Sequence, residues 1–134
     1  MTQLELARQG IITPQMKSVA EYESLEVEPV RQGVANGTIV IPANTRHPNL
    51  IPCGIGRGLR TKVNINIGTS SDYGNIDTEL GKLQVAIDGG TDTVMDLSTG
   101  GDIAKVRRAV IGATCLAVGT VPIYQAGIEA IEKH

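Results

Sequence analysis

From Thr61 onward the chain repeats one strand, one loop and one helix, three times over. Each expected strand is a short run of apolar and β-branched residues, and each expected helix has apolar residues three or four positions apart. The strands are expected at 61–68, 92–97 and 116–123. The helices are expected to begin near Asn75 or Ile76, after Gly101 and near Tyr124. Strands that alternate with helices in this way predict parallel βα units and an α/β fold.

The first of these strands alternates in polarity. Its apolar positions would lie on one face and its polar positions on the other, namely Val63, Ile65 and Ile67 against Lys62, Asn64 and Asn66. In a doubly wound open sheet, helices cover both faces and such a strand is apolar throughout. The glycines of GIGRG precede the strand, so they do not match the GxGxxG turn of a dinucleotide-binding fold. The polar face favours a β/α barrel whose interior lines a pocket.

We therefore predict that residues 61–134 are the first three βα units of a (β/α)8 TIM-type barrel, which is incomplete as it stands. A closed barrel needs eight strands and typically about 250 residues. Three strands leave two open edges, and open edges invite pairing with other chains. We expect the chain to be a piece of a larger protein and to form a homo-oligomer.

The first sixty residues predict a separate region that is mainly helical. Thr2 and Glu5 form a capping-box pattern, and Gly10 would end the short helix that follows them. Thr13 and Pro14 mark the start of a second helix, which is expected to run to about residue 23.

The rest of this region is expected to lead into the barrel. Pro29 would open a third helix that contains Gly33 and ends near Gly37. The β-branched run at 38–42 predicts a short strand, and the Pro and Gly clusters at 43–60 predict an ordered loop. The predicted domains are therefore 1–60 and 61–134.

Composition excludes several classes of protein. The 134 residues carry 12 basic and 14 acidic side chains, which gives a net charge of −2 and no basic patch for nucleic acid. No apolar run approaches the roughly 20 residues of a membrane span, and the first residues are not a signal peptide, so a cytoplasmic protein is expected. Cys53, Cys115, His47 and His134 match no metal-ligand spacing, so no metal site is predicted and the cysteines are expected to be buried thiols.

In a β/α barrel, ligands bind at the carboxyl ends of the strands. The segments expected there are 67–75, 96–102 and 119–126, which are rich in Gly, hydroxyl and amide residues. Simpler roles stay open for several of them: Asp102 could cap its helix, and Asp96 could be a structural acceptor. Asn64 and Asn66 could satisfy each other, and the STGG turn at 98–101 could bind an anion. By themselves these residues predict part of a barrel that binds a small polar ligand.

Four longer strings carry a more specific resemblance. They are IVIPANTRHPN at 39–49, GIGRGLRTKVNINIGTSSDYG at 54–74, DTVMDLSTGGD at 92–102 and GTVPIYQA at 119–126. Together they resemble the N-terminal part of the phosphomethylpyrimidine synthase family. The similarity extends through nearly the whole chain, including the opening MTQLELARQGIIT.

The resemblance implies a radical enzyme of thiamine biosynthesis, a carbon–carbon lyase. Such an enzyme converts 5-aminoimidazole ribotide to 4-amino-5-hydroxymethyl-2-methylpyrimidine phosphate, with carbon monoxide and formate as by-products. It uses S-adenosylmethionine, a [4Fe-4S] cluster and a divalent metal, zinc or iron, held by two histidines. The family's CxxCxxxxC motif has no counterpart in this chain, so the resemblance implies a segment without catalysis or bound cofactors of its own.

Three substrate-binding positions of the family match residues of this sequence. The resemblance implies that Asn66 contacts the substrate through its amide, that Met95 packs beside it and that Tyr124 contributes a phenol. Thr45-Arg46 replaces a usual Ile-Asn, and Cys115 stands where Pro is common. Two alternatives stay open: a related 5-hydroxybenzimidazole synthase, which shares these motifs, and a non-catalytic remnant that acts by association.

Overall fold

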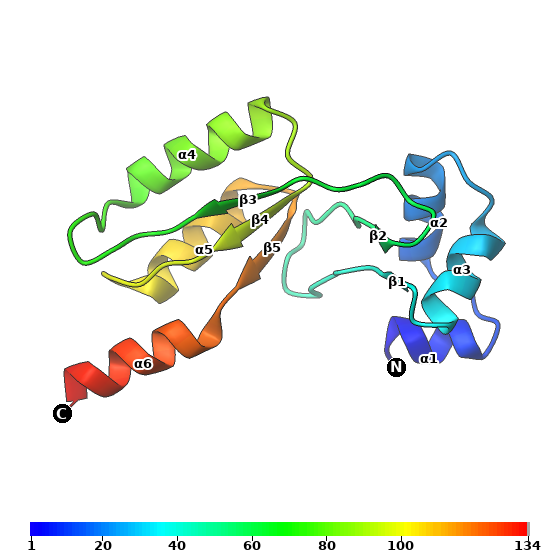
Figure 1. Ribbon diagram of the computed structural model, residues 1–134, viewed down its shortest axis with the longest axis horizontal. Coiled ribbons are helices and arrows are strands. Elements are labelled where there is room, and N and C mark those ends of the chain that lie inside the picture. Colours follow the sequence, from blue (N-terminus) through cyan, green and yellow to red (C-terminus); the bar gives the residue numbers. More distant parts are fainter. Residues whose placement is uncertain (134) are drawn as a thin grey trace. The chain divides into compact units, whose positions relative to one another are not determined.

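The computed structural model describes residues 1–133, apart from the side chain of Glu132. The chain forms two compact units, Met1–Lys62 and Val63–His134, which are described separately (Figure 1). His134 itself, one of the two histidines considered above, lies outside the described residues.

Three short helices make up most of the first unit: α1 (Gln3–Arg8), α2 (Pro14–Tyr22) and α3 (Val27–Ala35). The predicted starts of the first two are confirmed. Thr2 and Glu5 form the complete capping box, and the Thr13 hydroxyl accepts a hydrogen bond from the Met16 amide at 3.2 Å. The predicted start of α3 at Pro29 is wrong by two residues. Proline is tolerated there because the first-turn amides of a helix have no intrahelical acceptor.

A two-stranded antiparallel ribbon completes the first unit. It pairs β1 (Ile39–Val40) with β2 (Ile55–Gly56), so the expected strand at 38–42 is shorter than predicted. The strand β2 lies inside the segment predicted to be a loop. The pairing depends on Gly56, because a Cβ atom there would lie 2.1 Å from the Thr38 carbonyl oxygen.

Aliphatic side chains from all three helices and from β1 form the core of the first unit. Its buried members are Ala7, Met16, Val19, Ala20, Val30, Val34, Ile39 and Ile41. The glycine inside α3 has a packing reason. A Cβ atom at Gly33 would lie 2.4 Å from Cδ1 of Ile39 and 2.8 Å from its Cγ1. Gly33 therefore lets the β1 side chain approach the helix backbone.

A buried ion pair fixes the last residues of the first unit to the end of α2. Glu23 Oε1 lies 2.7 Å from Lys62 Nζ, with side chains only 5% and 4% exposed, and Glu23 Oε2 accepts the Arg60 amide at 2.8 Å. The expectation that Lys62 lies on the polar face of a barrel strand is therefore wrong. Burial raises the pKa of the Glu23 carboxyl, but these hydrogen bonds and the Lys62 and Arg60 charges outweigh it, and the pKa falls below its ordinary 4.5.

The second unit consists of three βα pairs with parallel strands in the order β3-β4-β5. The strands are β3 (Asn64–Ile67), β4 (Thr93–Asp96) and β5 (Ala117–Thr120), and the helices are α4 (Ile76–Asp88), α5 (Ile103–Ala113) and α6 (Pro122–Lys133). The prediction of an α/β fold with parallel βα units is confirmed. The last helix begins two residues earlier than predicted, because Pro122 suits the first helical position.

Helices α4 and α5 contact each other, and their apolar side chains form one core with those of the sheet (Figure 1). The buried residues of this core are Ile67, Leu83, Val94, Val106 and Val110. Ala113, the last residue of α5, is exposed, and Val63, predicted to lie on the apolar face of the first strand, is 54% exposed. Val63 precedes the paired part of β3, where its carbonyl oxygen accepts hydrogen bonds from the amides of Asp92 and Thr93.

Gly33 and Ile39 should be energetically coupled. In the wild-type background, we expect Gly33→Ala to destabilise the first unit by about 1 kcal/mol, because overpacking outweighs the gain in helix propensity. In an Ile39→Ala background, where the two nearest side-chain atoms are gone, the same change should stabilise by roughly 0.5 kcal/mol. Urea unfolding of the four proteins measures both effects, and additive changes would contradict this packing.

The Glu23 carboxylate should make stability depend on pH. Its pKa is lower in the folded chain, so its contribution is present above about pH 4.5 and is lost as the pH falls through the folded pKa. At pH 7, Glu23→Gln leaves Lys62 buried without its counterion and should cost about 3 kcal/mol. Urea unfolding from pH 7 to pH 3 should then show a flatter profile for this variant. Glu21→Gln, an exposed carboxylate of α2, serves as the control and should keep the wild-type profile.

Candidate functional site

The parallel register brings two of the three predicted site residues together. Asn66 is the partner of Met95 across β3 and β4, and Met95 is the partner of Gly119 across β4 and β5. A Cβ atom at Gly119 would lie 2.9 Å from the terminal carbon of Met95. Gly119 therefore gives the methionine side chain room to lie across the third strand. Asn66 is exposed and Met95 is half-buried, so both can be reached from the sheet surface.

A chain of side-chain hydrogen bonds runs along the same face. The Thr93 hydroxyl donates to Asn64 Oδ1 at 2.9 Å, and Asn64 Nδ2 donates to Asn66 Oδ1 at 3.1 Å. The interpretation that the two asparagines satisfy each other is therefore confirmed for Asn64, whose amide is hydrogen-bonded at both ends. It is not confirmed for the Nδ2 atom of Asn66, which donates to no acceptor among residues 1–133.

Tyr124 lies on the first turn of α6, close to where the sequence predicted the last helix to begin. Its side chain is 44% exposed. With Thr99 and four further residues of α6 it lines a hollow of about 310 Å³. The structure thus pairs Asn66 with Met95 in the sheet and places Tyr124 beyond the end of β5.

The loops that follow β3 and β4 are joined by buried polar contacts. Asp96 Oδ1 accepts from the Ser98 amide at 3.0 Å and from its hydroxyl at 2.5 Å. Ser98 Oγ accepts from the Thr69 amide at 3.1 Å, and the Thr69 hydroxyl donates to the Gly100 carbonyl at 2.6 Å. Asp96, Ser98 and Thr69 are all buried. The interpretation of Asp96 as a structural acceptor is confirmed.

Glu79 of α4 also holds the end of β3, and sequence reasoning missed it. Its side chain is 1% exposed, Oε2 accepts the Gly68 amide at 2.7 Å, and Oε1 lies 2.6 Å from Lys82 Nζ. A signal was present, because position 79 lies three residues after Ile76 and four before Leu83. A carboxylate within this apolar stripe has to find a buried partner.

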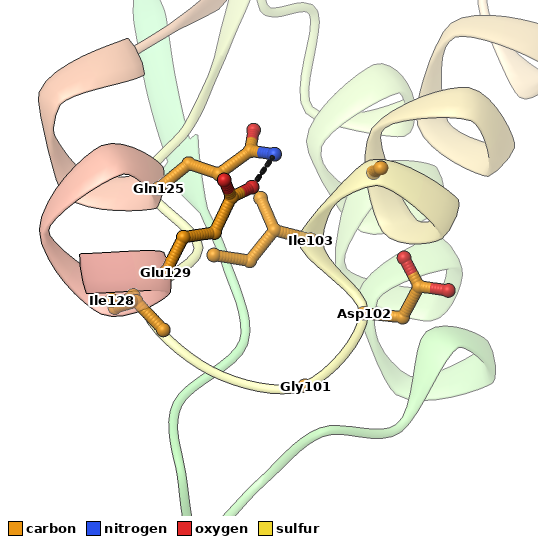
Figure 2. A pocket seen from close by; sticks show the side chains of 7 residues that line it. Gly101, Asp102, Ile103, Gln125, Ile128 and Glu129 are labelled. Atoms are coloured by element: carbon orange, nitrogen blue, oxygen red, sulfur yellow. Dashed lines mark hydrogen bonds between the residues drawn. The ribbon is translucent and has the colours of Figure 1, made fainter. Parts of the chain in front are cut away.

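A second hollow, of about 210 Å³, lies between the start of α5 and the side of α6. Asp102 caps α5 by accepting the Lys105 amide at 2.9 Å, as one reading of the sequence proposed. Figure 2 shows Gln125 and Glu129 pointing toward Ile103, with the Gln125 amide donating to the Glu129 carboxylate. The Arg107 guanidinium also donates to Gln125. The carboxylates of Asp102 and Glu129 in the lining disfavour an anion here, which weakens the anion hypothesis for STGG.

Metal-binding side chains are scattered. Within the described part of the chain, no group of three or more His, Cys, Asp or Glu side chains could hold a metal ion. Cys53 belongs to the first unit and Cys115 to the second, and both are half-buried, not buried as expected. Over residues 1–133, no helix combines the length and the apolar character needed to cross a membrane.

Comparison with known proteins gives a consistent result. A sequence profile described as the Radical SAM ThiC family matches residues 2–134. The chain is 60% identical over all 134 residues to a phosphomethylpyrimidine synthase of Moorella thermoacetica. It is 57% identical to one of a Thermoanaerobacter species and 55% to one of Dehalococcoides mccartyi, again over its full length. It spans 31% of the length of each of these relatives. The chain belongs to the Radical SAM ThiC family.

Proposed function

We propose that this chain forms part of the substrate-binding site of a phosphomethylpyrimidine synthase in thiamine biosynthesis. The reaction is the conversion of 5-aminoimidazole ribotide to 4-amino-5-hydroxymethyl-2-methylpyrimidine phosphate. The observation that carries the proposal is the 60% identity, without a gap in coverage, to a protein of that name. Because the match covers the whole chain, it includes the sheet and the loops that adjoin Asn66 and Met95.

We assign three contacts of the substrate to this chain. The exposed Asn66 amide lies at the carboxyl end of β3 and can exchange hydrogen bonds with a polar ligand. Met95, its register partner, offers a flexible apolar surface against a flat ring. Tyr124 adds a phenol at the start of α6. These positions agree with the rule that ligands of β/α barrels bind at the carboxyl ends of the strands.

The fold proposal is that the second unit supplies three consecutive βα units of a (β/α)8 barrel. Three observations support it: parallel neighbours in sequence order, a polar face that carries Asn64 and Asn66, and open edges at β3 and β5. Helix α6 also exposes Ile123 by 71% and Ile131 by 80%, which a further strand would cover. Without that strand, a second copy of the chain would pair with the same edges, which supports a homo-oligomer.

The [4Fe-4S] cluster and the zinc or iron of the proposed enzyme do not fit the side chains described. The two cysteines belong to different units, and residues 1–133 contain no cluster of three ligands. We therefore assign these groups to other parts of the longer family proteins. The role proposed for this chain is to bind and orient the ribotide.

A chimeric enzyme tests the proposal. We would replace the matching segment of the Moorella thermoacetica relative with this chain and assay pyrimidine phosphate formation anaerobically, with the cluster reconstituted. The chimera should be active. Tyr124→Phe and Asn66→Ala should each lower kcat/KM by about tenfold, the loss expected for one well-placed hydrogen bond to substrate.

Tyr22→Phe is the matched control, because Tyr22 is a 61% exposed tyrosine of the first unit, outside the segments expected at the carboxyl ends of the strands. Its kcat/KM should equal that of the unmodified chimera. A folded, cluster-loaded chimera that forms 5-hydroxybenzimidazole would favour the related synthase. A chimera that forms neither product would favour a non-catalytic remnant, and equal losses for both tyrosine variants would remove Tyr124 from the site.

A further inference from the structure

The amide of Asn66 has two ends of nearly the same shape and opposite chemistry. Its oxygen can only accept hydrogen bonds, and its NH₂ group can only donate them. Which end faces a ligand therefore decides what the ligand must offer. The exposed position of Asn66 leaves one end of the amide directed away from the protein.

In the structure, the hydrogen bonds of the neighbouring side chains give that amide a direction. Asn64 takes the Thr93 hydroxyl proton on its oxygen, so its own NH₂ group is turned toward Asn66. Asn66 must then present its oxygen to Asn64, at 3.1 Å, and direct its NH₂ group away from it. In this order of donors and acceptors, the NH₂ group is the end of the Asn66 amide that faces the open side.

Thr93 is well placed to begin this series of side-chain hydrogen bonds. It is the register partner of Asn64 and is only 9% exposed. The single proton of the Thr91 hydroxyl is shared between the Thr93 and Val63 carbonyl oxygens, each 3.0 Å from Oγ1. The Thr91 hydroxyl thus contacts backbone only and takes no part in the side-chain hydrogen bonds that run from Thr93 to Asn66.

We propose that Thr93 and Asn64 are positioning residues that orient Asn66 so that its Nδ2 donates to an acceptor atom of the ligand. The chemical class is a ligand with an electron-rich oxygen or ring nitrogen at this point, such as the imidazole, ribose or phosphate acceptors of a ribotide. The choice of a ribotide rests on the proposed function; the direction of the amide does not. An outward oxygen would instead repel a phosphate or any other acceptor.

The direction of the amide can be measured on the chain itself. In a chain labelled with ¹⁵N and ¹³C, we expect a coupling across the hydrogen bond from Asn64 Nδ2 to Asn66 Cγ. Thr93→Ser keeps the hydroxyl and should keep the coupling, whereas Thr93→Val has nearly the same shape without the donor and should lose it. A coupling in the opposite sense, from Asn66 Nδ2 to Asn64 Cγ, would overturn the proposed direction.

The consequence for the ligand is tested in the chimeric enzyme. Thr93→Val should raise KM for 5-aminoimidazole ribotide by about 2- to 10-fold with kcat nearly unchanged, because a single neutral hydrogen bond is lost equally from ground and transition states. Asn64→Asp places an acceptor against the Asn66 oxygen, turns the amide round and should raise KM at least as much. Thr93→Ser should restore a nearly normal KM.

Thr91→Val is the matched control, since it also removes a buried threonine hydroxyl near β3 but leaves the hydrogen bonds from Thr93 to Asn64 and Asn66 intact. It should lower Tm as Thr93→Val does and leave KM unchanged. If Thr91→Val and Thr93→Val raise KM equally, the positioning role is overturned and the effect is structural. If the chimera makes no pyrimidine product, the proposed function fails, while the coupling measurement still decides the direction of the amide.

Discussion

The pairing register between β3 and β4 is the constraint on which the rest of the second unit depends. Because side chains alternate along a strand, the pairing of Asn66 with Met95 also places Asn64 beside Thr93 and puts Ile65 and Val94 in the core. A slip by one residue would turn the polar row into the core and the apolar row outward. The core, the hydrogen bonds from Thr93 to Asn66, and the proposed ligand contacts of Asn66 and Met95 therefore all depend on the same register.

Buried polar contacts extend this register beyond the strands. Asp96, Ser98 and Thr69 join the two loops, and Glu79 accepts the amide of Gly68 from the helix side. Glycine is required where the loops meet, because a Cβ atom at Gly68 would lie 2.6 Å from the Ser98 amide nitrogen and one at Gly100 2.4 Å from Ser70 and Ser71. The carboxyl ends of β3 and β4 are thus held by contacts that a small change in loop position would break.

The sequence predicted the elements better than their contacts. Capping residues and helical periodicity are local, so Thr2, Thr13 and the stripe of α4 fixed the helix positions within about two residues. Strand ends were less accurate, because pairing with a distant segment decides them: the regular ladder of β3 begins only at Asn64, and Ile55 pairs with Val40 inside a predicted loop. The site pair Asn66–Met95 followed from a family resemblance plus parallel topology. The position of Glu79 in an apolar stripe signalled its burial, but its partner Gly68 could not be foreseen. The Lys62–Glu23 pair could not be foreseen either, because tertiary packing decides both contacts.

The most direct test of this interpretation is the strand register in solution. Backbone nuclear Overhauser contacts in the labelled chain should pair Asn66 with Met95, and Met95 with Gly119, in a parallel ladder. That result would place the donor amide and the methionine side by side on the polar face of the sheet. A ladder shifted by one residue, with Met95 opposite Ile65 or Ile67, would turn Met95 to the other face and contradict the proposed site.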